Sequence, residues 1–144
     1  MNQQTYGNHQ RWVPMYHFVS SLVIYAAFIG SLVNLYKSIS GGAGVYSASL
    51  ITALAFSLVW VHYYARGFAL RAQDRAIRAE ENFRHFVMNG KLLDAKLTMR
   101  QIIGLRFASD EEFLELEKRA VAENLSESDI KKTIKNWRGD YYRV

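Results

Sequence analysis

Residues 12–65 read WVPMYHFVSSLVIYAAFIGSLVNLYKSISGGAGVYSASLITALAFSLVWVHYYA and hold one formal charge, Lys37. This lysine separates two uncharged stretches, and each is long enough to supply the roughly 20 apolar residues that a helix needs to cross a bilayer core. A helix of a soluble protein would show a polar residue every three or four positions on one face, and neither stretch does so. The sequence therefore predicts an all-α chain that begins with a two-helix transmembrane hairpin.

Residues that start or end helices set the expected boundaries. Pro14 suits the first turn of a helix, where its missing N–H would have had no intrahelical partner. Three glycines between positions 38 and 44 are typical of a turn between helices. The expected parts are a cytoplasmic segment over 1–13, a hairpin over 14–64 with spans over 14–36 and 45–64, and a cytoplasmic helical domain over 65–144.

Charge is distributed unevenly along the chain. Residues 1–65 contain Arg11, Lys37 and no acidic residue, whereas all 13 acidic residues and the remaining basic ones follow. The second half is thus mixed in sign, which does not favour nucleic-acid binding. The chain has no cysteine, which excludes disulfides, zinc ribbons and a thiol nucleophile.

Basic residues near the span ends predict the orientation of the hairpin. The turn carries only Lys37, whereas the opposite end carries a group of basic and aromatic residues that would anchor the spans at the membrane surface: Arg11, Trp12, Arg66, Arg71, Arg75 and Arg78. Because positive charge concentrates on the cytoplasmic side, both termini are expected there. The arginines can also attract anionic lipid headgroups.

A narrow apolar stripe follows the second span, on a helix predicted from 66 to 88 with a stop at Asn89-Gly90. It is called the alanine seam below and consists of Ala69, Ala72, Ala76, Ala79, Phe83 and Phe86 at alternating spacings of three and four. We expect the seam to pack on the chain's own later helices, with a second copy or another membrane subunit as alternatives. Ser49 and Ala53 extend the expected interface into the second span, where small residues let helices approach closely. Glu80 and Arg84 are spaced for an i,i+4 ion pair on this helix.

Capping signals predict three short helices in the tail. Thr98, Ser109 and Ser126 are candidate N-caps, and the first two have Gln or Glu three residues later, as in a reciprocal capping box. The helices are expected over 99–107, 110–124 and 127–137. Their apolar residues predict a small core: Ile102, Ile103, Leu105, Phe107, Phe113, Leu114, Leu116, Val121, Leu125, Ile130, Ile134 and Trp137.

The sequence contains no catalytic signature and no metal-ligand spacing. His17 and His62 fall at similar depth in the two spans, and two such imidazoles could ligate the iron of haem b. The simpler interpretation is that both are interfacial polar residues bonded to backbone or headgroups. A homo-oligomeric channel lined by span hydroxyls is a further alternative, whereas a DNA-binding helix is disfavoured because the helix over 110–124 is acidic.

Three stretches carry a family resemblance. They are Asn8-His9-Arg11-Trp12-Pro14 with His17, the run from Tyr64 to Asn82, and Leu105-Arg106-Phe107-Ala108-Ser109-Asp110-Glu111-Glu112. Together they make the chain resemble a family of uncharacterised small bacterial membrane proteins, some of which are labelled ABC transporter permeases. The resemblance implies a two-span protein of the bacterial inner membrane, with no established activity or ligand. Two spans cannot by themselves enclose a transport path.

These observations predict a non-enzymatic integral membrane protein, without a cofactor. Its expected role is that of an accessory or scaffold subunit that acts through helix packing. Its partners would be other membrane subunits or itself, together with anionic lipid headgroups and no nucleic acid.

Overall fold

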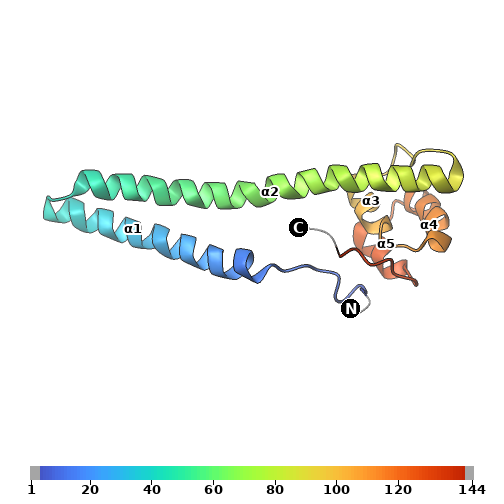
Figure 1. Ribbon diagram of the computed structural model, residues 1–144, viewed down its shortest axis with the longest axis horizontal. Helices are drawn as coiled ribbons and strands as arrows, with labels where there is room; N and C mark the ends of the chain where they lie inside the picture. The colour runs from blue at the N-terminus through green and yellow to red at the C-terminus, as the bar shows by residue number, and fades with distance from the viewer. Residues whose placement is uncertain (1–3, 142–144) are drawn as a thin grey trace. The chain divides into compact units, whose positions relative to one another are not determined.

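The computed structural model describes residues 4–141 of the chain (Figure 1). The predicted all-α class is confirmed, since the described residues form helices and one isolated antiparallel bridge, Ala108 to Trp137. The elements in chain order are a π-helical segment η1 (Met15–Ser20), α1 (Ser21–Gly41), α2 (Val45–Asn89), α3 (Met99–Leu105), α4 (Asp110–Ala122) and α5 (Glu127–Thr133).

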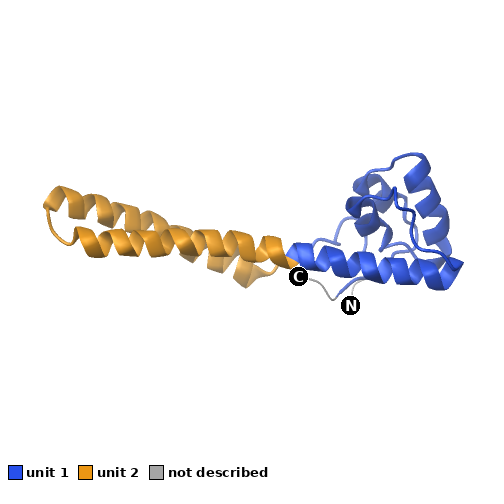
Figure 2. Cartoon of the chain, turned by 90° about the horizontal axis from the view of Figure 1, so that it is seen from above, with its two compact units in different colours: residues 1–10, 70–144 blue, residues 11–69 orange. Residues whose placement is uncertain are grey.

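The chain divides into two compact units, drawn in different colours in Figure 2. Residues 11–69 form one unit, the hairpin unit, and residues 4–10 join residues 70–141 in the other, the helical unit. Helix α2 is continuous from the first into the second, so the expected second span and the expected helix over 66–88 are parts of one helix. It ends at the predicted position, where Gly90 has a φ of +66°.

In the hairpin unit, η1 and α1 run antiparallel to the first half of α2 (Figure 1). Ser31, Ala48 and Ala55 are buried where the helices meet, and the Thr52 hydroxyl donates to the Ser31 carbonyl at 3.2 Å. Helix α1 continues past the expected end at 36 to Gly41. The turn is consequently shorter than expected, and Gly42 and Gly44 supply its left-handed backbone.

Within residues 4–141, two helices are long and apolar enough to cross a membrane, Met15–Gly41 and Val45–Asn89. Little of their apolar surface is covered by the rest of the protein. In the most apolar 18-residue window of each helix, the share of the window that is buried is 6% for Met15–Gly41 and 11% for Val45–Asn89.

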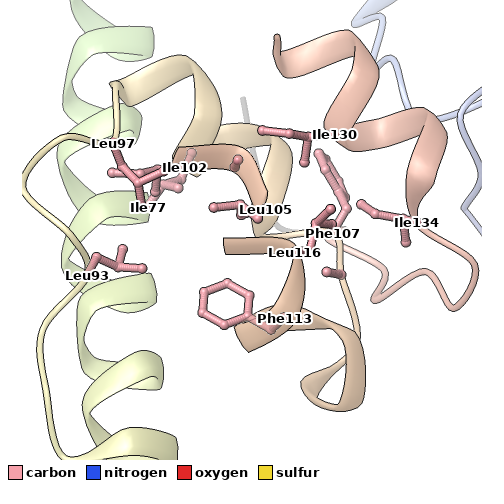
Figure 3. Packing of buried hydrophobic residues seen from close by; sticks show 12 residues of the cluster. Ile77, Leu93, Leu97, Ile102, Leu105, Phe107, Phe113, Leu116, Ile130 and Ile134 are labelled. Carbon is pink, nitrogen blue, oxygen red and sulfur yellow. The ribbon is translucent and has the colours of Figure 1, made fainter. Parts of the chain in front are cut away.

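The helical unit has one hydrophobic core, shown in Figure 3. Phe107, Phe113 and Leu105 are fully buried at its centre, and Ile77 of α2 contributes from one side. All twelve predicted core residues lie in this core or pack against it. The sequence did not predict five further members, Ile77, Leu93, Leu97, Ala108 and Ala120.

The short helices begin where the capping signals place them and end earlier than expected. Thr98 and Gln101 form the predicted capping box of α3, and Ser126 caps α5 by accepting from the Asp129 N–H at 3.2 Å. The capping box predicted for α4 is wrong, because the Ser109 hydroxyl does not cap the helix. Glu112 instead accepts from the backbone N–H groups of residues 135 and 136, at 3.0 and 2.9 Å, which ties the segment after α5 to α4.

Candidate functional site

The alanine seam is exposed along the part of α2 that belongs to the helical unit. Ala72, Ala76 and Ala79 are exposed, and Phe83 and Phe86 leave 68% and 52% of their surface exposed. The expectation that the seam packs on the chain's own later helices is therefore wrong. Ala69, at the other end of the seam, is half-buried.

A different face of α2 covers the core of the helical unit. Ile77, Glu81 and His85 are buried and Met88 packs against the core, at successive spacings of four, four and three. Residues at such spacings share one face of a helix. This face is nearly opposite the seam, so α2 presents the seam away from its own domain.

Polar contacts hold this face of α2 in place. The Arg84 guanidinium donates to Glu81 at 3.1 Å, to Asp110 at 2.6 and 2.8 Å and to the Ala108 carbonyl at 2.7 Å. It also lies 4.3 Å from the centre of the Phe113 ring. The predicted Glu80–Arg84 pair is wrong, because Arg84 turns toward the core side of α2, where Glu81 and Asp110 lie.

A second buried cation lies near this cluster. Arg106 forms an ion pair with Asp140 at 2.8 Å, with 7% of the arginine side chain exposed. Burial lowers the pKa of the Arg106 guanidinium from its ordinary value, and the negative charges of Asp140 and Glu81 oppose that shift. Arg84 and Arg106 thus each have an acidic partner, which limits the cost of removing these two charges from water.

In the hairpin unit, His62 contacts polar side chains from η1 and α1. Its Nε2 is 3.0 Å from the Ser21 hydroxyl and its Nδ1 is 3.4 Å from the Ser20 hydroxyl. The Tyr16 ring stacks on the imidazole at 4.4 Å, and the Tyr16 hydroxyl donates to the His62 carbonyl. Tyr16 and Ser21 are also joined to each other, since the Ser21 hydroxyl donates to the Tyr16 carbonyl at 3.2 Å.

His17 has a separate environment. Its Nδ1 lies 3.0 Å from the Val13 carbonyl, and its ring contacts those of Trp12 and Tyr16. His62 would have to leave a serine hydroxyl, and His17 would have to present its other nitrogen, before both could bind one haem iron. The contacts fit the interpretation of two interfacial polar residues better.

Other residues expected at interfaces lie on the outside of the hairpin unit. Ser49 and Ala53 are exposed, because Ala48, Thr52 and Ala55 form the contact with α1. The hydroxyls of Ser49 and Ser57 donate to the carbonyls of residues 46 and 53 of their own helix. Span hydroxyls that are satisfied in this way give no support to a pore lining.

The expected anchor residues are at the surface, with one exception. Arg11, Trp12, Arg71, Arg75 and Arg78 are exposed. Arg66 is half-buried and lies 6.0 Å from the centre of the Tyr16 ring. The four arginines of α2 follow the apolar part of the helix directly, which suits an anchor at a membrane surface.

The N-terminal segment packs on the helical unit, which the sequence did not predict. Gln4 exchanges two hydrogen bonds with the backbone of Asp140, at 3.0 and 2.8 Å, and the Tyr6 hydroxyl lies 3.0 Å from that of Ser128. The His9 ring contacts Phe107 and Trp137. These partners are more than 95 residues apart in the sequence, so no local pattern could reveal them.

This packing also frames a groove of about 610 Å³ in the helical unit. It is lined by side chains of both signs, including Arg100, Glu127 and Lys131. These charges already pair with one another, since Glu127 accepts from Lys131 at 2.6 Å and from Arg100 at 3.2 Å. Among residues 4–141 no three histidine or acidic side chains gather closely enough to hold a metal ion.

Comparison with known proteins places the chain in a family. No significant match was found among curated proteins or among solved structures. A family model matches residues 1–144, the full length of the sequence, and its description is "Family of unknown function (DUF6526)". The expected membership of an uncharacterised family is thereby confirmed, and the chain belongs to the DUF6526 family.

Proposed function

We propose that this protein is a non-enzymatic integral membrane protein that anchors a small helical domain at the membrane surface and docks partners through α2. Its place would be the bacterial inner membrane, with both termini in the cytoplasm. The observation that carries the proposal is the exposed alanine seam, which continues directly from a helix able to span a bilayer.

The hairpin unit supports a lipid environment. Large apolar side chains such as Leu22, Leu54 and Val61 are more than 60% exposed. A soluble protein rarely exposes an apolar surface of this extent, because water penalises each such side chain. Lipid tails remove that penalty, and the backbone of both helices is already satisfied internally, as spanning segments require.

Contacts within the helical unit support the proposal that both termini lie on the same side of the membrane. Residues 4–10 precede the first apolar helix and pack against residues 70–141, which follow the apolar half of the second. Segments in such contact must lie on the same side of any membrane that the two helices cross. The arginines of α2 favour the cytoplasmic side.

The membrane placement is tested by labelling single cysteines, since the chain has none of its own. Full-length protein with Ala43→Cys, in the turn, should react with a membrane-impermeant maleimide in intact bacterial cells. Lys118→Cys, exposed in the helical unit, should react only after the cells are permeabilised. Release of the protein from membranes by alkaline carbonate, or equal labelling of both variants in intact cells, would contradict the proposed placement.

Docking through the seam is tested by placing a charge in it. Phe83→Glu should reduce the mass of the protein particle extracted in mild detergent, as measured by light scattering, because the carboxylate cannot be buried in an apolar contact without a partner. Arg78→Glu changes a neighbouring exposed charge outside the seam and should leave the mass unchanged. An equal mass for wild type and Phe83→Glu would remove the seam from the proposal.

A further inference from the structure

We propose that the alanine seam is the contact between two copies of this chain, which pair in parallel along the second half of α2. This inference rests on the proposed function, because insertion in one membrane fixes the relative direction of the two helices. It specifies a partner, a register and an ion pair, which the proposed function leaves open.

The spacing of the seam matches a coiled-coil contact. Ala72 and Ala79 take the d positions of a heptad, and Ala76 and Phe83 take the a positions, so that they share one narrow stripe. Met88 and the buried Glu81 then fall at f positions, opposite that stripe. A second copy can therefore pack on α2 without disturbing the face that covers the core.

Charges beside the seam fit a parallel pair of identical helices. Arg75 takes a g position and Glu80 takes the e position of the following heptad, and in a parallel coiled coil these two positions face each other across the contact. Both residues are exposed, and neither forms an ion pair within the part of the chain that the structure describes. Two-fold symmetry creates the Arg75–Glu80 pair twice.

The apolar part of the contact also suits a second copy. In a parallel pair each seam residue meets its own counterpart, so the alanines allow the helices to approach closely and Phe83 and Phe86 pack on the same residues of the other chain. Both phenylalanines are more than half exposed in the single chain. Two copies with the same membrane topology present α2 in the same direction, which is the direction that the charges require.

Disulfide formation between single-cysteine variants of the full-length protein in native membranes tests the pairing. Ala72→Cys and Ala79→Cys should each shift most of the protein to a covalent dimer on mild oxidation, because only close Cα atoms can form a disulfide. The matched controls Arg71→Cys and Arg78→Cys lie at c positions, directed away from the partner, and should remain monomeric. An antiparallel pair can bring only one residue of each helix opposite its own copy, so cross-linking at both 72 and 79 requires the parallel arrangement.

A charge swap tests the register. In the Ala79→Cys background, Arg75→Glu and Glu80→Arg should each lower the rate of dimer formation by about tenfold, since each places two like-charge contacts across the pair. The double variant Arg75→Glu with Glu80→Arg restores opposite charges and should recover the original rate. The two single changes alter the net charge of the protein in opposite directions. A general effect of net charge on membrane binding would therefore not slow dimer formation in both variants.

The outcomes separate this inference from the proposed function. Equal cross-linking of seam and control cysteines, or no recovery in the double variant, would overturn the parallel pair. If the parallel pair is overturned but the protein stays in carbonate-washed membranes, the proposed membrane anchor is still supported. A protein that is soluble yet cross-links at both seam positions would support the pair and refute the membrane placement.

Discussion

Replacing Arg84 with alanine is expected to lower the free energy of unfolding of the helical unit by about 3 kcal/mol, because it breaks a buried charge network. Only 10% of the Arg84 side chain is exposed, and its guanidinium joins α2 to Asp110 and to the Ala108 carbonyl. Its loss leaves the Glu81 carboxylate, 6% exposed, without its closest cation, and the cations near it are then Arg138 at 3.7 Å and the more distant Arg106. A buried carboxylate that loses its closest cation costs more than the contact itself contributes.

The measurement is chemical denaturation of the full chain in detergent, followed by the fluorescence of Trp137 with Trp12 and Trp60 replaced by phenylalanine. Arg78→Ala removes an exposed arginine from the same helix and should change the free energy by less than about 0.5 kcal/mol. Adding Glu81→Gln to Arg84→Ala removes the buried charge and should recover part of the loss. If Arg84→Ala matches Arg78→Ala, the network does not stabilise the unit.

Replacing Phe107 with alanine is expected to cost about 4 kcal/mol, the largest effect among the variants considered, because a large cavity opens in a close-packed core. The Phe107 side chain is fully buried, and its ring contacts those of Trp137 and His9 at 5.1 and 5.8 Å. Residues 4–10 should therefore lose contact with the helical unit together with the core. Amide hydrogen exchange in that segment should become faster.

Leu92→Ala is the control, since it removes a large apolar side chain from a position of the same unit that is 66% exposed and lies outside the seam. It should change the free energy of unfolding by less than about 0.5 kcal/mol. A loss below about 1 kcal/mol for Phe107→Ala would mean that this core is not close-packed as described.

The face of α2 that meets the core shows the limit of reasoning from the sequence. The alanine seam looked like the packing face because its residues are small or apolar at helical spacing. The face that packs includes Glu81 and His85, which a local pattern assigns to the surface. Two contacts offset the free-energy cost of burying these side chains. Arg84 pairs with Glu81, and the Lys91 carbonyl lies 2.6 Å from the His85 ring.

The sequence by itself determined the two long apolar helices, the glycine turn between them and the end of α2 at Gly90. It also determined two of the three helix caps and most of the core of the helical unit. These features depend on neighbours within a few residues or on the length of an uncharged run, both of which can be read directly. Only the tertiary structure decided which face of α2 is covered, that residues 4–10 join the helical unit, and that His62 contacts Tyr16, Ser20 and Ser21. Those outcomes depend on contacts between residues distant in the chain, whose pairing follows from the packing of the whole unit and from no local pattern.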